Sequence, residues 1–351
     1  MDFILNGQAH GSVASMLMAS GFNTNALRPY NIDGKGTYIT VNKGGKMVPE
    51  LISNATATLR KDDWILLDTQ IVKAAKPRLN LVKELRSRGL TMNIPNGMGK
   101  TVLQTQTQSD ISEAEISMNG LRESKKDRIE FDLTNLPLPI IHKDFEINLR
   151  ELEASRNGGS PLDTSNAELA ARRVAELTET LATGTYGSYK FGGGLIYGLV
   201  NYPGRMTKVM TAPTHTSWTG KTLVKEVLAM KKQSQDQFHY GPWILFNSPD
   251  WDQYLDEDYS DAKGDNTLRE RIEKIKNIAA VVTLDYLTAY TMVLVQLTPD
   301  VIREVIGMDI TTLQWESHGG LLLHFKVMTI QVPQIRSDHN GNTGIVHGTA
   351  T

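Results

Sequence analysis

The sequence contains no cysteine among its 351 residues. This absence excludes a disulfide framework, catalysis by a thiolate, and zinc or iron–sulfur centres held by cysteine. An excess of charge of one sign is also lacking, because 37 Lys and Arg stand against 39 Asp and Glu, which gives a formal net charge of -2. Tight sequence-independent binding of nucleic acid needs many basic residues, so this balance argues against it.

Long hydrophobic runs are lacking as well. No Lys or Arg precedes Arg28, so the positive region of a secretory signal is missing and no leader is expected. The longest apolar stretches, "GGGLIYGLV" and "TMVLVQL", are shorter than the roughly 18–20 residues that a membrane-spanning helix needs. With 40% hydrophobic and 22% charged residues, the composition predicts a folded, soluble protein of two or three domains.

Catalytic motifs are missing or incomplete. The segment "NGMGKT" ends like a phosphate-binding loop, but Ile94 stands where the first glycine is required and the chain continues with a strand pattern, which indicates a turn that enters a hairpin. The eight histidines show no H-x-x-x-H pair, and His324 lies in a strand pattern, where packing or surface exposure is the favoured interpretation. We therefore expect no enzyme activity, no cofactor and no bound metal.

The sequence favours neither a calcium loop nor an isopeptide bond. The acidic segment "DEDYSDAKGD" lacks the glycine that a calcium loop needs at its sixth position, so a solvated loop is favoured. An isopeptide bond would need a lysine, an asparagine and a carboxylate that takes the amine proton, but exposed lysines and turn-forming asparagines are the better interpretation. The residues concerned are Lys100, Lys125, Lys126, Asn340 and Asn342.

The best-formed helix is predicted over residues 165–183. Ser165 and Glu168 match a capping box, and Gly184 can take the left-handed conformation that ends the helix. One apolar stripe is formed by Ala170, Val174, Leu177 and Leu181, widened by Ala167, Ala171, Ala175 and Ala182. The solvent face is predicted to carry Glu168, Arg172, Arg173, Glu176 and Glu179.

The chain before this helix divides into several segments. Residues 1–62 are too irregular for a compact domain and are predicted to form an extended arm. Residues 63–88 read as a helix that ends at Gly89, with Pro77 either dividing it or opening its second part. The alternating segments "TVLQTQTQSD" and "DRIEFDLTNL" predict a long polar hairpin, and "KDFEINLRELEAS" predicts a strand.

The chain after this helix is predicted to form a compact α/β unit followed by a long strand. Helices are expected at 220–236, 248–255, 266–277 and 298–307, the second and the last because a capping residue precedes a proline. Strands are expected at 242–247, 278–283 and 291–297, and an unusually long one at 321–333.

Several motifs follow one another in an order that resembles a known family. They are "LPLPIIHKDFEINLRELEASRNGGSPLDTSNAELAARRVAELTETLATG", "YGPWILFNSPDWDQYL", "IEKIKNIAAVVTLDYL", "IGMDITTLQWES" and "LLLHFKVMTIQVPQ". This series, which covers about residues 136–334, resembles the major capsid proteins of tailed bacteriophages with the Hong Kong 97-type fold and the related encapsulin shell proteins. The long irregular arm, in place of the short first helix of encapsulins, favours the virus capsid.

The resemblance implies an α+β fold with five parts. They are an N-terminal arm at 1–62, a helix and connection at 63–100, an extended loop (E-loop) hairpin at 101–131, a peripheral (P) domain at 132–191 and 317–351 with the long spine helix, and an axial (A) domain at 192–316. A polar hairpin that cannot bury itself in its own chain can lie across a neighbour. The implied function is a structural major capsid protein without catalysis, located in the virion capsid and assembled in the host cytoplasm.

The resemblance also implies partners. Copies of the chain would form hexameric and pentameric capsomers of an icosahedral shell around double-stranded DNA bound without sequence specificity, with portal, scaffolding or decoration proteins as further partners and no membrane. Contacts between subunits are expected at Lys100, Arg122, Glu123, Lys125, Lys126, Arg128, Asp256, Glu257, Asp258 and Asp261.

Two rival functions remain open at this point. One is an encapsulin-like nanocompartment shell that holds a cargo enzyme. The other is an α/β enzyme whose site is assembled from scattered residues such as His318, Asp285 and Tyr286.

Overall fold

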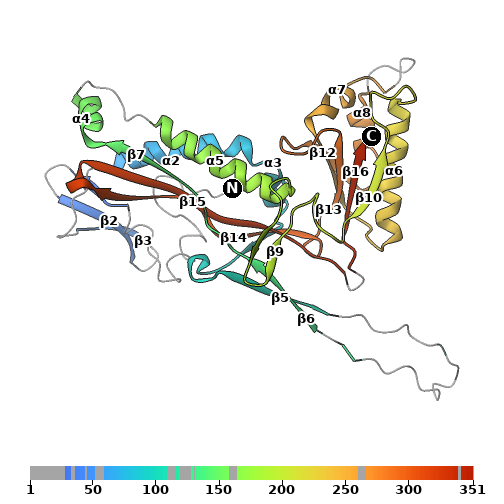
Figure 1. Cartoon of the computed structure of the whole chain (residues 1–351), viewed down its shortest axis with the longest axis horizontal. Coiled ribbons are helices and arrows are strands. Elements are labelled where there is room, and N and C mark those ends of the chain that lie inside the picture. The colour runs from blue at the N-terminus through green and yellow to red at the C-terminus, as the bar shows by residue number, and fades with distance from the viewer. Residues whose placement is uncertain are drawn as a thin grey trace.

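The computed structural model confirms an α+β fold in which two sheets lie at opposite ends of the molecule (Figure 1). It describes residues 28–32, 36–43, 46–51, 59–108, 116, 118, 128–129, 131–157, 164–259, 266–338 and 341–350. The N-terminal part of the predicted arm and most of the tip of the predicted E-loop therefore lie outside the described residues.

A four-stranded sheet forms one end of the molecule, with the strand order β4-β14-β15-β7. Its strands are β4 (Thr91–Asn93), β14 (Ile302–Ser317), β15 (Leu322–Ile335) and β7 (Ile141–Asn148). The antiparallel hairpin β14–β15 is its longest part, and the short turn η5 (His318–Gly320) joins the two strands. The long strand predicted at 321–333 is confirmed as β15.

Helices α2 (Lys61–Ala75) and α5 (Ser165–Thr183) cover one face of this sheet (Figure 1). Trp64 of α2 meets Phe325 of β15 edge to face at 6.1 Å between ring centroids, inside a shared apolar core. Pro77 divides the first helical segment as predicted, since α2 is followed by η2 (Lys76–Arg78) and α3 (Asn80–Ser87).

The spine helix α5 has the predicted apolar stripe and the predicted end. Ala170, Val174 and Leu181 are buried, and Gly184 takes the left-handed conformation with φ 91°. Two details differ. Thr164 rather than Ser165 is the residue before the first turn, because the Glu168 N–H donates to its carbonyl. Glu168 instead accepts from the Thr164 hydroxyl at 3.1 Å.

Glu179 is the third difference, because it was predicted on the solvent face and is only 1% exposed. Helix α3 packs against this part of α5, and its first N–H groups need acceptors that the helix itself cannot supply. Glu179 provides them. Its carboxylate accepts from Leu81 N–H at 2.5 Å and from Val82 N–H at 3.4 Å.

A five-stranded sheet forms the other end, with the order β10-β16-β13-β11-β12. Its strands are β10 (Met206–Met210), β16 (Ile345–Ala350), β13 (Thr291–Gln296), β11 (Trp243–Asn247) and β12 (Ile278–Thr283). The accompanying helices are α6 (Gly220–Asp236), η4 (Pro249–Trp251), α7 (Asp252–Leu255) and α8 (Leu268–Glu273). The predicted strands and the helices near 220–236 and 248–255 are confirmed.

The helix predicted at 298–307 is wrong. Thr298 and Pro299 start only one turn, in which the Val301 and Ile302 N–H groups donate to the Thr298 carbonyl. From Ile302 onward the chain pairs with β15, where its β-branched side chains fit a pleated, buried surface better than a helix.

The predicted division into domains remains a proposal. Two segments, however, pair with strands of another predicted domain than the one to which they were assigned. β16 was placed with the P domain, yet it pairs with β10 and β13 in the five-stranded sheet. β14 was placed in the A domain, yet it pairs with β15 in the four-stranded sheet. Pairing with strands distant in sequence decides the position of β16, and no local pattern in the sequence carries that information. β14 instead forms a hairpin with β15, the strand that follows it along the chain.

Smaller elements complete the fold. Within the predicted arm, β1 (Tyr30–Ile32), β2 (Gly36–Lys43) and β3 (Lys46–Leu51) form a three-stranded antiparallel sheet, so this part is more regular than expected. The remaining elements are η3 (Gly97–Gly99), β5 (Val102–Gln108), β6 (Phe131–Pro137), α4 (Leu149–Asn157), β8 (Tyr189–Phe191) and β9 (Gly194–Ile196). The "NGMGKT" segment is thus a single turn before a strand, as predicted.

Candidate functional site

The hairpin of β5 and β6 projects away from both sheets (Figure 1). Its strands pair in antiparallel register from Val102 opposite Pro137 to Gln108 opposite Phe131. Phe131 and Leu133 lie on one face of β6, because side chains alternate along a strand, and they are 63% and 57% exposed. An apolar strand face of this kind is left open at the far end of the described hairpin.

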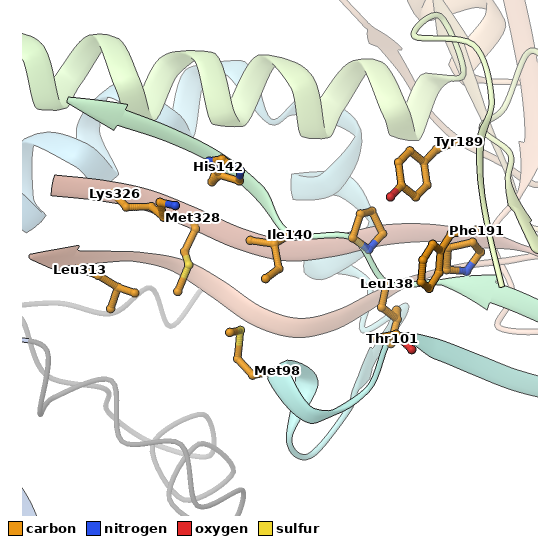
Figure 2. A pocket seen from close by; sticks show the side chains of 12 residues that line it. Met98, Thr101, Leu138, Ile140, His142, Tyr189, Phe191, Leu313, Lys326 and Met328 are labelled. Atoms are coloured by element: carbon orange, nitrogen blue, oxygen red, sulfur yellow. The ribbon is translucent and has the colours of Figure 1, made fainter. Parts of the chain in front are cut away.

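An apolar pocket of about 570 Å³ lies at the base of the same hairpin. It opens on the face of the four-stranded sheet opposite α2 and α5, since Lys326 and Met328 alternate with Phe325 and Val327, which are buried under the helices. Figure 2 shows the side chains that line it around the strands of the sheet. They are Met98, Thr101, Pro137, Leu138, Pro139, Ile140, His142, Tyr189, Phe191, Leu313, Lys326 and Met328.

Charged groups lie on the sheet beside this pocket. Asp144 of β7 is 3.6 Å from Lys326 Nζ and 3.5 Å from His142 Nδ1. These pairs are open to solvent on the sheet face, so each contributes at most about 1 kcal/mol. The pocket can therefore accept apolar side chains, with polar partners available at one side.

Further along the same face, Ser317, His324 and Glu146 lie in a row. Ser317 Oγ is 2.6 Å from His324 Nε2, and Trp315 stacks on the imidazole with 5.3 Å between ring centroids. Glu146 is 3.7 Å from His324 Nδ1, beyond hydrogen-bond distance, so it does not orient the ring as the acid of a catalytic triad does. No local pattern in the sequence indicates this group, because its members come from three strands.

The residues of the rival enzyme site are not brought together. Asp285 lies beside α3, where Asn80 Nδ2 is 3.4 Å from its carboxylate, and α3 contacts the beginning of β14. His318 follows the far end of this 16-residue strand, which spans roughly 50 Å at about 3.3 Å per residue.

The predicted subunit-contact residues fall into two groups. Within the described chain, Lys100, Arg128, Asp256, Glu257 and Asp258 are exposed, and Asp256 pairs with Arg269 at 3.0 Å. Outside the described residues lie Arg122, Glu123, Lys125, Lys126 and Asp261. Their role in subunit contacts stays a prediction. Asn342 donates to Gln237 Oε1 at 2.7 Å, as expected of a structural side chain.

A buried charged cluster joins the elements behind the pocket. Arg86 of α3 lies 2.8 Å from Glu304 and 3.0 Å from Asp309, both on β14. Burial acts to lower the pKa of Arg86, but Glu304 and Asp309 outweigh it and raise that pKa. Burial raises the pKa of Glu304, and Arg86 opposes this shift.

Glu179 adjoins this cluster. Burial raises its pKa to about 8, against the lowering effect of the hydrogen bonds from Leu81 and Val82. The carboxylates of Glu304 and Asp285 raise it further. Glu179 is therefore protonated at neutral pH, and this cluster serves to hold α3, α5 and β14 together.

Neither a metal site nor a membrane helix is found in the part of the chain that the structure describes. No group of three or more His, Asp or Glu side chains there is placed to hold a metal ion. No helix among these residues is long and apolar enough to cross a membrane. The projecting hairpin and the apolar pocket remain the strongest candidate site.

Comparison with known proteins agrees with this geometry. Residues 54–348 match the model of a family of unknown function, DUF6260. The chain belongs to this family. The matched range includes the projecting hairpin, the residues that line the pocket and nearly all of both sheets.

Relatives of this DUF6260 member include shell proteins. The chain is 26% identical over 205 residues to the type 1 encapsulin shell protein EncA of Myxococcus xanthus, and this alignment spans 58% of the chain and 65% of that relative. Among solved structures, it resembles the virus-like particle from Pyrococcus furiosus, with a TM-score of 0.56 and 16% identity over 80% of this chain and 97% of that one.

The capsid of the myovirus XM1 is a further structural neighbour, with a TM-score of 0.56 and 13% identity over 76% of this chain and 91% of that one. The DUF6260 member therefore has the Hong Kong 97-type capsid fold, as the sequence motifs indicated.

Proposed function

We propose that this protein is a structural shell subunit, without catalytic activity, that assembles with identical copies into a closed icosahedral particle. One observation carries the proposal. The chain exposes an apolar strand face and an apolar pocket that it cannot bring together itself, because Phe131 lies six residues beyond Pro137 at the pocket, roughly 20 Å along a strand that points away.

A second copy supplies the missing partner for each surface. The hairpin of one subunit covers the pocket of its neighbour, whose own hairpin is then free for the next subunit. Such head-to-tail contacts between different surfaces generate rings when the rotation closes. Each subunit would thereby bury apolar groups that it exposes when alone, and the sum of these contacts stabilises the particle.

The proposal extends to the contents of the particle. The shell consists of hexameric and pentameric capsomers and encloses double-stranded DNA, which a chain with a formal net charge of -2 holds without sequence-specific binding. The subunits assemble in the host cytoplasm and become the capsid of the virion. Portal, scaffolding or decoration proteins complete the assembly.

Sedimentation velocity and negative-stain microscopy of the purified protein test the shell function. The proposal predicts particles that sediment far faster than any small oligomer of a 39.0 kDa chain and appear as closed shells. A monodisperse monomer or dimer across a wide range of concentration and salt would contradict it.

A nanocompartment that holds a cargo protein is the second candidate function. The similarity to an encapsulin shell protein favours it. Nuclease treatment of intact particles distinguishes the two candidates, because a virus capsid protects DNA of genome length, whereas a compartment co-purifies with a cargo protein and protects no such DNA.

A further inference from the structure

A second pocket, of about 320 Å³, lies on the other side of the hairpin base. Its walls come from β5, β6, β9 and the end of β15, so it lies at the junction between the projecting hairpin and the sheet. Backbone is packed closely here, since a Cβ at Gly194 would lie 2.1 Å from the Asn135 carbonyl oxygen. The polar residues that line the pocket are Thr105, Thr134, Asn135, Tyr197, Tyr202, Gln334, Arg336 and Ser337.

One arginine, Arg336, lines this pocket, and a second, Arg303, adjoins it through a hydrogen bond to the lining residue Gln334. Arg303 pairs in register with Gln334, and Arg336 follows Gln334 by two residues, directly beyond the end of β15. The Arg336 N–H donates to the Val301 carbonyl, so the extended pairing continues and both side chains lie on the same face of the hairpin. Neither guanidinium forms an ion pair with a carboxylate among the residues that the structure places. Burial, and next to it the charge of Arg336, lowers the pKa of Arg303.

The surrounding groups are suited to an anion that also carries a hydroxyl. Arg303 donates its Nε–H to Gln334 Oε1 at 2.6 Å, which orients the guanidinium beside the pocket and leaves its other N–H groups for a ligand. Asn135 Oδ1 is buried and has no hydrogen-bond donor within the described chain. A hydrogen phosphate ion offers three acceptor oxygens to the arginines and one O–H to this carbonyl.

We propose that this pocket binds a phosphate-class oxyanion between Arg303 and Arg336. The proposal concerns the single subunit and holds whether or not the chain forms a shell. The ion neutralises two like charges that lie close together, and it connects the end of β15 with the walls from β6 and β9. Its binding therefore stiffens the base of the projecting hairpin.

Titration of the purified full-length protein with inorganic phosphate tests the site, with isothermal calorimetry for affinity and melting temperature as a second readout. Sodium chloride at matched ionic strength is the reference, because salt alone screens the repulsion between the arginines. We expect the phosphate affinity to fall at least tenfold in Arg336→Gln and in Arg303→Gln. Arg173→Gln, which removes an arginine that is 66% exposed on α5, is the matched control and should leave the affinity unchanged.

The melting temperature without phosphate supplies an independent check on folding. Because removal of either arginine relieves repulsion, both variants should melt at or above the temperature of the unmodified protein in chloride and should lose only the phosphate-dependent gain. Equal responses to phosphate in all four proteins, or none in the unmodified protein, would overturn the proposal. If a short DNA duplex displaces bound phosphate, the site takes a phosphate group of nucleic acid. If the duplex does not compete, the site takes the free phosphate ion.

Discussion

Glu179 is a buried acidic residue that accepts hydrogen bonds from the first N–H groups of helix α3. A carboxyl group with a pKa of about 8 in the folded state, against an ordinary value of 4.5, keeps its proton in the folded chain after the unfolded chain has lost it. Between these two values the folded state binds more protons, so the free energy of unfolding falls as pH rises. The reverse dependence is expected of surface carboxylates that gain a cationic partner.

Glu179→Gln should remove this pH dependence. The amide oxygen still accepts the Leu81 N–H, and no charge has to be buried at high pH. We expect similar stability of the two proteins at pH 4.5 and an advantage of a few kcal/mol for the variant at pH 9, at about 1.4 kcal/mol per pKa unit. Urea unfolding at both pH values measures the difference. Glu176→Gln, three residues earlier on the same helix and only half-buried, is the control that should retain the original pH dependence.

Arg86 is the cation of the neighbouring buried cluster and pairs with two carboxylates. Arg86→Met leaves Glu304 and Asp309 buried without their cation, and removal of one partner of a buried pair costs about 3–5 kcal/mol. Urea unfolding at pH 7 should show that loss. Arg88→Met, two residues away, removes an ion pair with Glu84 near the surface and should cost less than about 1 kcal/mol. Equal losses in the two variants would mean that the buried cluster does not stabilise the fold.

At the scale of elements, the C-terminal end of the spine helix depends on a glycine. Gly184 has φ 91°, and a Cβ there would lie 2.8 Å from Asn201 Oδ1 and 3.1 Å from the Gly198 carbonyl carbon. Gly187 has a similar φ of 99° but has no heavy atom within 4 Å of that position. Ala at Gly187 should therefore cost about 1–2 kcal/mol of backbone strain, and Ala at Gly184 clearly more. Because the two glycines have similar φ, the difference in melting temperature between the two variants measures the steric part of the cost at Gly184.

Under the proposed shell function, the projecting hairpin is the element that assembly requires. Replacement of Phe131 and Leu133 by Ser removes two exposed apolar side chains that do not belong to any core of the subunit, so the far-ultraviolet circular dichroism and melting of the isolated subunit should persist. Sedimentation velocity should show loss of particles. Phe238→Ser removes a comparably exposed aromatic residue of the other end of the molecule, 77% exposed, and should still assemble.

Local patterns predicted most elements, and distant pairings explain most of the failures. The stripe of α5, the break at Pro77 and the strand β15 follow from spacing and residue type, which the sequence displays directly. The strand at 302–317 was not predicted, and a helix was expected at its start because a capping residue before a proline also opens a single turn. The pocket could not be predicted, since its walls come from segments as distant as Met98 and Met328.

For the whole molecule, the two sheets and the projecting hairpin make an extended subunit rather than a closed globule (Figure 1). Its apolar surfaces are not all covered within one chain, so the stable state is expected to include identical neighbours. The chain shares the Hong Kong 97-type fold with the XM1 capsid and the virus-like particle from Pyrococcus furiosus. In the proposed particle, repeated contacts between subunits would supply stability without disulfides.

Because the chain contains no cysteine, introduced cysteines can test directly whether the hairpin of one subunit covers the pocket of its neighbour. Cysteines introduced together at Phe131 on the hairpin and at Ile140 in the pocket are too far apart in one chain to form a bond, which needs Cα atoms within about 7 Å. Mild oxidation and non-reducing electrophoresis should give a ladder of covalent multimers from the double variant. Each single variant should give no species beyond a dimer. If the double variant stays monomeric under oxidation while its particles are intact, the hairpin does not cover the neighbour's pocket, and the central claim is contradicted.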